Sequence, residues 1–174
     1  NGIEHAVYVD NYKLYYFKST DNGNNWTKEQ IITNHEGDIY LASVVVDGLG
    51  KVYIGFTVHD LFNYSNPTGV GSGSEFYYDL YCIHNKNGSW TSELVGLHES
   101  GNAGPRILGL FVDANYNVHI IANRYGWFSV GGEIWEWVRN ASSNTWGTRV
   151  TVAYFNDAGI DRVIYDNCVI VPDQ

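Results

Sequence analysis

The feature that most constrains the fold is a short aromatic-rich run that recurs three times along the 174 residues. The runs start at Leu14, Leu80 and Ile134. A polar turn and a tryptophan follow each run, and the tryptophans are Trp26, Trp90 and Trp146. The spacings between the tryptophans nearly equal the spacings between the runs. Unrelated segments would not keep two such similar series of spacings, so the chain is built of repeats.

A second pair of segments repeats in the same register. Val44 to Asp47 and Leu110 to Asp113 have the same offset as the first two runs, and each precedes a short turn and a further apolar run. The runs are rich in β-branched and aromatic residues and of strand length, and no long segment has the apolar spacing of a helix. The sequence therefore predicts an all-β chain with about four strands per repeat. For the middle repeat we expect strands at 39–47, 51–60, 75–85 and 89–97.

Four-stranded antiparallel repeats of this length are typical of the blades of a β-propeller. The first repeat lacks an innermost strand, because residues 3–10 resemble the second strand of the other repeats. Propellers typically have 4–8 blades, so three blades make half of a six-bladed ring or a fragment. A second copy, as a two-fold dimer, or a missing half of the protein would complete the ring. The expected single unit spans 1–174, with repeats at 1–38, 39–103 and 104–160 and a closing strand at 161–174.

The turn after the first run carries a specific motif. The segment from Ser19 to Trp26 fits the pattern Ser-x-Asp-x-Gly-x-x-Trp at every defined position. It resembles the Asp box, or BNR repeat, of the sialidase-like β-propellers. Ser19 and Asp21 can bond local backbone N–H groups, and Gly23 permits a positive φ. Trp26 can pack the turn onto the adjoining sheet.

The resemblance implies a fold rather than an activity, since in that family the box lies on the outer rim, away from the active site. Sialidases of the family hold the substrate carboxylate with three arginines, one of them in an Arg-Ile-Pro type motif that is absent here. Arg139 and Arg149 fall near the outer turn and the outer strand, where we expect them not to reach the channel. Arg106, Arg124 and Arg162 could sit near the shared face. Sialidase activity from this chain alone is therefore not expected.

Composition and charge exclude several classes of function. The chain has 10 Lys and Arg against 19 Asp and Glu, a net charge of −9 that repels a phosphate backbone. Neither nucleic acid nor an anionic membrane surface is therefore an expected partner, and no run approaches the roughly 18 apolar residues of a membrane span. Cys82 and Cys168 lack partners at the spacing of zinc or redox motifs, so no metal site or cofactor is expected. They are either buried free thiols, which the sequence favours, or one disulfide.

The loops around the central channel of a propeller usually bind the ligand, and here they hold the candidate site residues. Some of these loops repeat a His/Asn and Glu/Asp pair near a glycine, and others combine charged strand ends with aromatic rings. This mixture suits sugars, whose apolar faces stack on rings while their hydroxyls bind polar groups. The same residues could instead cap their own turns or cover the core. The candidate ligand-binding residues are His35, Glu36, His59, Asp60, His98, Glu99, Arg106, Arg124 and Trp127.

Two classes of function fit these residues. The first is a non-catalytic carbohydrate- or protein-binding propeller, either an assembly unit or a piece of a larger extracellular protein. The second is a glycan-active enzyme of the sialidase-like superfamily, a glycoside hydrolase or a polysaccharide lyase. We favour binding, because no residue set matches a catalytic motif and the net charge disfavours an anionic polysaccharide. The candidate catalytic residues of the second class are His35, His59, His98, Tyr125 and Arg124.

Overall fold

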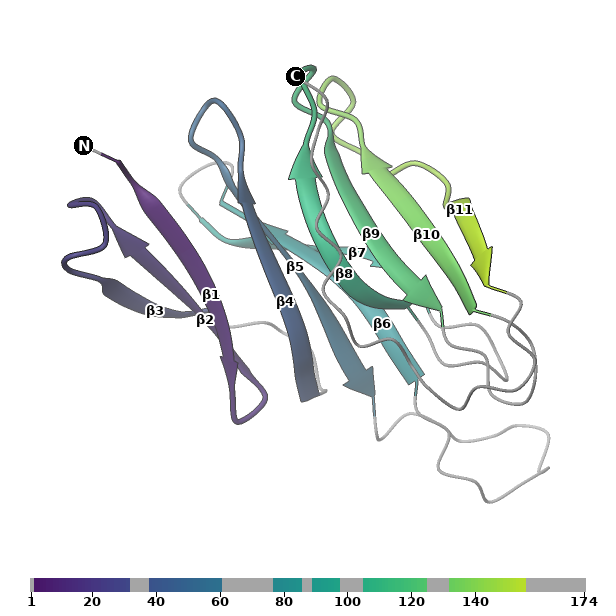
Figure 1. The fold of residues 1–174 in the computed structure, drawn as a ribbon, viewed down its shortest axis with the longest axis horizontal. Helices are drawn as coiled ribbons and strands as arrows, with labels where there is room; N and C mark the ends of the chain where they lie inside the picture. The colour runs from purple at the N-terminus through teal and green to yellow at the C-terminus, as the bar shows by residue number, and fades with distance from the viewer. Residues whose placement is uncertain are drawn as a thin grey trace.

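The computed structural model describes residues 2–31, 38–60, 77–85, 89–97, 105–124 and 132–155. In these ranges the chain forms eleven β-strands and no helix, which confirms the all-β prediction. Figure 1 shows the strands in three groups that follow one another along the longest axis of the molecule. The strands are β1 (Glu4–Asp10), β2 (Lys13–Ser19), β3 (Thr27–Ile31), β4 (Asp38–Val46), β5 (Val52–Asp60), β6 (Tyr77–His84), β7 (Thr91–Gly96), β8 (Pro105–Val112), β9 (Val118–Arg124), β10 (Gly132–Arg139) and β11 (Val150–Phe155).

The strands form three antiparallel sheets, and in each sheet the spatial order follows the order along the chain. The first sheet has the order β1-β2-β3, the second β4-β5-β6-β7 and the third β8-β9-β10-β11. The four strands of the second sheet begin and end within two residues of the predicted boundaries. Three antiparallel sheets therefore stand where the sequence predicts three repeats, and the described sheets do not close into a ring.

The first sheet has three strands, and β1 forms its edge. β1 pairs with β2 from Glu4 opposite Ser19 to Asp10 opposite Lys13, in the way that β5 pairs with β6 in the second sheet. Residues 3–10 thus take the place of a second strand, as predicted. The predicted closing strand at 161–174 lies outside the described residues.

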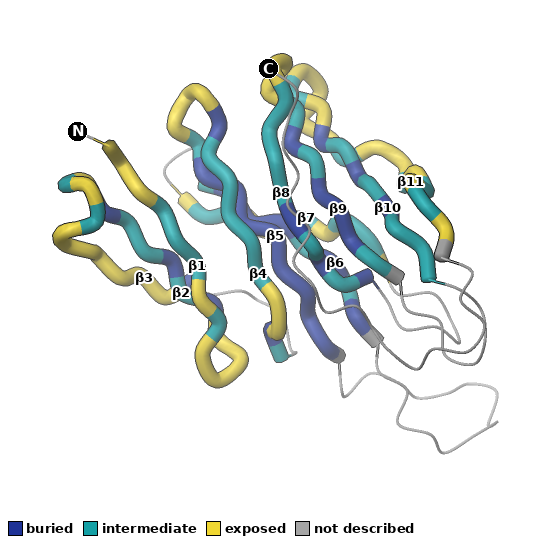
Figure 2. Tube along the Cα trace, viewed as in Figure 1, coloured by how far each residue is buried: buried dark blue, intermediate teal, exposed yellow. Residues whose placement is uncertain are grey.

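The hydrophobic core consists of two clusters, each between two neighbouring sheets. Successive side chains of a strand point to opposite faces of its sheet, so one sheet can serve two clusters. One face of the second sheet, with Phe56, packs on Leu14 of the first sheet. The opposite face, with Cys82, packs on Trp135 of the third sheet. The second sheet is therefore covered on both faces, and Figure 2 shows the resulting deep burial along β5.

Two glycines let the second and third sheets approach closely. A Cβ atom added at Gly55 would collide with Cδ1 of Ile107, and one added at Gly96 would lie 2.7 Å from the ring of Trp137. The backbone N–H of Ile107 also donates to Oγ1 of Thr57 at 3.0 Å. Because interiors are close-packed, these contacts fix the two sheets relative to each other.

A tryptophan and a glutamate join each pair of neighbouring sheets. The indole N–H of Trp90 donates to Oε1 of Glu29 at 2.9 Å, and that of Trp146 donates to Oε2 of Glu93 at 2.9 Å. In both contacts the glutamate belongs to the outermost strand of the preceding sheet. We call these two contacts the tryptophan latches. They place Trp90 and Trp146 between neighbouring sheets.

The second latch belongs to a larger polar network. Arg139 is only 3% exposed, and its Nε and Nη2 donate to the two carboxylate oxygens of Glu93 at 2.8 and 3.0 Å. Nε2 of His84 lies 3.1 Å from Oε1 of Glu93. Burial alone would raise the pKa of Glu93, but the bonds from Arg139 and His84 outweigh burial and lower the pKa to about 2. Arg139, predicted near the outer turn, thus joins the second and third sheets from the end of β10.

The predicted Asp box forms a compact turn between β2 and β3. Oγ of Ser19 accepts the backbone N–H groups of Gly23 at 2.9 Å and Asp21 at 3.3 Å. The carboxylate of Asp21 accepts the backbone N–H of Asn25 at 2.9 Å, and Gly23 has a φ of 78°. These three predicted roles are confirmed. Trp26 differs from the prediction, because it is 43% exposed and donates to the carbonyl of Gly23 in its own turn at 3.0 Å.

Candidate functional site

Side chains from all three sheets meet at one end of the molecule. This is the end at which β1 and β5 finish and β4, β6 and β8 begin. The turn between β2 and β3, which holds the predicted Asp-box motif, lies at the opposite end. We call the set the aromatic cluster, and its members are Tyr12 after β1, Tyr40 in β4, His59 in β5, Tyr78 in β6 and Arg106 in β8.

The rings of the aromatic cluster form a continuous series of contacts. The ring centroids of Tyr12 and Tyr40 are 5.4 Å apart, and Tyr40 lies edge-on to both His59 at 5.5 Å and Tyr78 at 6.2 Å. His59 stacks on Tyr78 at 5.0 Å. The Arg106 guanidinium lies 4.3 Å from the Tyr78 ring centroid, and its Nη2 donates to the Tyr78 hydroxyl at 3.0 Å. Edge-on, stacked and cation–π contacts of this kind hold each ring in one orientation.

Exposure divides the aromatic cluster into a base and a surface. His59 is 2% exposed and Tyr78 is 8% exposed, so these two rings form the base. Tyr12 is 48% exposed and Tyr40 is 42% exposed, so these two form the surface. Burial, together with a hydrogen bond to Tyr12, raises the pKa of Tyr40, so its hydroxyl stays protonated at neutral pH. The surface therefore offers two apolar ring faces with hydroxyl groups at their edges.

The structure brings two of the predicted ligand-binding residues together, namely His59 and Arg106. It also places Asp60 at the end of β5 and Arg124 at the end of β9, in register with Pro105. The remaining candidate residues lie outside the described part of the chain, and they are His35, Glu36, His98, Glu99, Tyr125 and Trp127.

Sequence reasoning missed the three tyrosines of the aromatic cluster. Tyr40 and Tyr78 lie in strands, where a tyrosine is indistinguishable from a core residue, and Tyr12 lies in a short turn. A usable signal did exist. Tyr40 is the third residue of β4 and Tyr78 the second residue of β6, so each tyrosine stands where a strand leaves the predicted ligand-binding loops.

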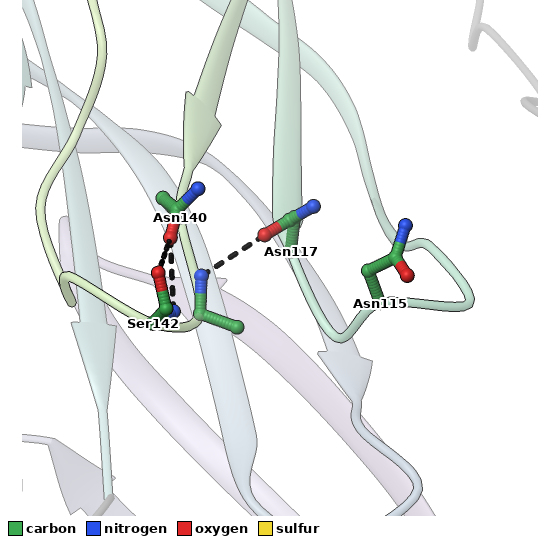
Figure 3. Close-up of a pocket in the computed structure, with 5 residues that line it drawn as sticks. Asn115, Asn117, Asn140 and Ser142 are labelled. Atoms are coloured by element: carbon green, nitrogen blue, oxygen red, sulfur yellow. Dashed lines mark hydrogen bonds between the residues drawn. The ribbon is translucent and has the colours of Figure 1, made fainter.

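The opposite end of the third sheet has an open depression of about 510 Å³, shown in Figure 3. Its walls are the β8–β9 turn, with Asn115 and Asn117, and the β10–β11 turn, with Asn140 and Ser142. The side-chain carbonyl of Asn140 accepts the backbone N–H of Ser142 at 2.9 Å and its hydroxyl at 2.6 Å. That of Asn117 accepts the backbone N–H of Ala141 at 3.0 Å and so joins the two turns. These amides hold the turns in shape, so the depression is a structural junction.

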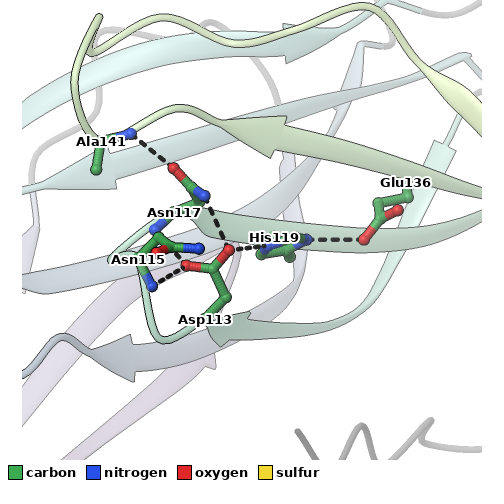
Figure 4. A network of polar contacts seen from close by, with 6 residues as sticks. All are labelled: Asp113, Asn115, Asn117, His119, Glu136 and Ala141. Carbon is green, nitrogen blue, oxygen red and sulfur yellow. Dashed lines mark hydrogen bonds and ion pairs between the residues drawn. The ribbon is translucent and has the colours of Figure 1, made fainter.

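A polar network extends from this junction across the third sheet, as Figure 4 shows. Nδ1 of His119 lies 2.8 Å from Oε1 of Glu136, and its Nε2 lies 3.3 Å from Oδ2 of Asp113. Asp113 also accepts the backbone N–H groups of Asn115 and Asn117, both at 2.8 Å. Burial alone would raise the pKa of Asp113, but the bonds from Asn117 and His119 hold it below its usual range. Both carboxylates are thus engaged in binding His119 and the turn.

Comparison with protein-family models and with curated proteins gives no match. No protein-family model matches the chain. No curated protein matches it either. Within the described ranges, no group of three or more His, Cys, Asp and Glu side chains could hold a metal ion. The same part of the chain contains no helix with the length and hydropathy of a membrane span.

Proposed function

We propose that the three sheets are blades of a sialidase-like β-propeller. Three observations support this. Each sheet keeps its strands in chain order, and neighbouring sheets pack face to face through the two core clusters. The turn between β2 and β3 has the side-chain-to-backbone bonds that an Asp box requires. The tryptophan latches repeat between successive sheets, as expected when each sheet packs on the next in the same way.

We propose that the aromatic cluster binds carbohydrate without transforming it. The observation that carries this proposal is the pair of exposed rings, Tyr12 and Tyr40, which come from two sheets and lie 5.4 Å apart on a buried base. The apolar face of a sugar ring can stack on such rings while its hydroxyls bond the tyrosine hydroxyls. The base fixes the rings before binding, so little conformational entropy is lost when the ligand binds.

A glycan array followed by titration calorimetry tests this proposal. We expect a neutral oligosaccharide ligand, since the net charge of −9 disfavours an anionic one. The Tyr40→Ala variant should weaken binding by about fivefold, because one aromatic contact contributes about 1 kcal/mol. The matched control is Tyr116→Ala, which removes a tyrosine of similar exposure, 45%, at the other end of the molecule. An array without ligand, or equal binding by the two variants, would overturn the proposal.

The second candidate function is a glycan-active enzyme, and one observation favours it. His59, Tyr78 and Arg106 are in contact, and a polysaccharide lyase needs a base, a proton donor and a cation of these types. The burial of His59 counts against this candidate, because a base must reach the proton that it abstracts. An assay for reducing ends and unsaturated products separates the two functions. Product formation that is lost in Tyr78→Phe would establish the enzyme and reject binding alone.

A further inference from the structure

The first and third sheets each have one face that no other sheet of the described residues covers, called the uncovered face below. On the first sheet this face carries Tyr8, Tyr15 and Phe17, with Tyr8 in register opposite Tyr15 and 60% exposed. On the third sheet it carries Glu136 and Val150, which are opposite each other, and Val150 is 55% exposed. Stacks of repeats that end in water normally have polar outer faces. Exposed aromatic and apolar residues on these faces indicate a surface that another protein element covers.

The repeats show what kind of surface the uncovered face of the first sheet is. Tyr15 and Phe17 correspond to Tyr81 and Ile83, which stand at the same places one repeat later. Ile83 and Tyr81 belong to the core cluster in which the second sheet packs on the first. The uncovered face of the first sheet is therefore the face with which a sheet packs on the sheet before it.

The uncovered face of the third sheet is the complementary one. Glu136 corresponds by the repeat to Tyr16 and Cys82. Tyr16 lies in the core cluster between the first and second sheets, and Cys82 lies in the cluster between the second and third sheets. Both point toward the sheet that follows their own. The third sheet thus presents a receiving face, and the first sheet presents the face that would dock on it.

The carboxylates that accept the indole N–H groups in the tryptophan latches also have a counterpart on the uncovered face of the third sheet. Each sheet has a receiving face, which points toward the sheet that follows. On each of these faces a carboxylate belongs to a pair of residues that lie opposite each other on the last two strands of the sheet. The pairs are Tyr16–Glu29, Cys82–Glu93 and Glu136–Val150. On the first two sheets the carboxylate belongs to the last strand, and on the third sheet it belongs to the neighbouring strand β10. Trp26 is the turn tryptophan that has no preceding sheet beside it in the described chain, and it donates within its own turn.

The charges of the two uncovered faces are also opposite. Lys28 lies opposite Phe17 on the first sheet, with its Nζ 3.8 Å from the ring centroid of Tyr15. The third sheet carries Glu136, whose neighbour His119 bridges it to Asp113. A cation beside aromatic rings on one face and carboxylates on the other favour association of the two faces over pairing of either face with itself.

We propose that two copies of this chain associate with the first sheet of each copy packed on the third sheet of the other. Trp26 of one copy then donates to Glu136 of the other, as the tryptophan latches do within the chain. This inference rests on the propeller arrangement proposed above, since two copies of three blades give six, the multiple of three within the usual 4–8. The two interfaces are identical, so a two-fold axis relates the copies and the assembly closes.

Sedimentation equilibrium of the 174-residue chain tests the proposal, with folding of every variant checked by circular dichroism. We expect a dimer for the unaltered chain. The Tyr8→Glu variant should raise the dimer dissociation constant by about tenfold or more, because it places a carboxylate without a partner in an apolar contact. The control is Leu49→Glu, a change of similar exposure, 65%, in the turn between β4 and β5, which should leave the dissociation constant unchanged. If Tyr8→Glu fails to fold, Val150→Glu tests the opposite face of the same interface.

A stable monomer at micromolar concentration would overturn the proposal. So would a dimer that Tyr8→Glu and Val150→Glu leave intact, or open oligomers of growing length in place of a closed dimer. The aromatic cluster lies within one chain, so glycan binding is measured separately on the same samples. A monomer that binds glycan overturns the dimer alone, and a dimer without glycan ligand overturns the binding function alone.

Discussion

Replacing Glu93 by Gln tests the contact that joins the second and third sheets. The Glu93 carboxylate bonds two groups of Arg139 at 2.8 and 3.0 Å and the indole of Trp146 at 2.9 Å, and it lies 3.1 Å from His84. The glutamine amide would keep the shape of the side chain and one acceptor oxygen. It would leave the Arg139 guanidinium, which is almost fully buried, without a counter-charge.

The expected loss can be estimated from the pKa of Glu93. A fall from 4.5 in the unfolded chain to about 2 in the folded protein corresponds to about 3 kcal/mol at full strength. The Glu93 side chain is 26% exposed, and solvent screening reduces this value to about 2 kcal/mol. The buried guanidinium adds a further cost that does not depend on the titration of Glu93. We therefore expect Glu93→Gln to lower the free energy of unfolding by about 3 kcal/mol at neutral pH.

The pH dependence separates the two parts of this loss. The folded-state pKa of Glu93 is lowered, so its charge stabilises the protein above pH 4.5, and this stabilisation disappears as the pH falls toward 2. Urea unfolding of both proteins at several pH values between 7 and about 2.5 gives the difference in free energy directly. The difference should shrink by about 2 kcal/mol across the acid range. Other carboxylates titrate in both proteins and cancel in the difference.

A difference that stays constant from neutral pH to about pH 2.5 would refute the reasoning, because the charge of Glu93 would then contribute nothing. The matched control is Glu29→Gln. Glu29 accepts the indole N–H of Trp90 at 2.9 Å in the first latch, where no arginine takes the place of Arg139 among the described contacts. Glutamine keeps one acceptor oxygen for this indole N–H, so Glu29→Gln should cost less than about 1 kcal/mol.

Three further predictions concern the turn, the sheet contact and the thiol. Ser19→Ala should lower the free energy of unfolding by about 1–3 kcal/mol, since Ser19 is buried and its Oγ accepts two backbone N–H groups; urea unfolding measures this, and an unchanged midpoint would contradict it. Gly55→Ala should cost about 1–3 kcal/mol, because the added methyl collides with Ile107; a melting temperature equal to that of the unaltered chain would show that the sheets can separate freely. In a Cys168→Ser background, Cys82 should react with a thiol reagent only after denaturation, because it is a free, buried cysteine whose thiol pKa is raised by burial; rapid labelling of the native protein would contradict this.

Much of the fold follows from local sequence signals. Alternating apolar residues and Gly- and Asn-rich turns locate the strands of the second sheet, and the repeat spacing gives the number of sheets. The carboxylate that we propose as the third indole acceptor, Glu136, is harder to predict, because the residue three positions after Trp146 is Arg149 where the first two repeats have glutamate. The strand register instead places Val150 opposite Glu136. Register depends on turn length, and the β10–β11 turn differs from the others.

The candidate site is less accessible to sequence reasoning, because it depends on three sheets converging. Tyr12, Tyr40 and Arg106 are far apart in the chain and meet only through the packing of whole sheets. His59 is predicted as a ligand-binding residue from its place at a strand end, and the structure places it in the buried base, stacked on Tyr78. The hydrophobic pattern predicts that a tyrosine lies in a strand, but it does not predict which end of the sheet is open to a ligand.

The two ends of the sheets differ in how their backbone groups are satisfied. At the end that holds the β2–β3 turn, single carboxylates close the turns: Asp47 accepts the N–H groups of Leu49 and Lys51, each at 2.9 Å, and Asp113 closes the equivalent turn of the third sheet. Such turns need nothing beyond their own residues. At the other end, exposed rings from separate sheets lie on a buried base and leave their faces open. The ligand that we propose would add contacts at this second end, where ring faces are exposed, whereas the turns at the first end already satisfy their own polar groups.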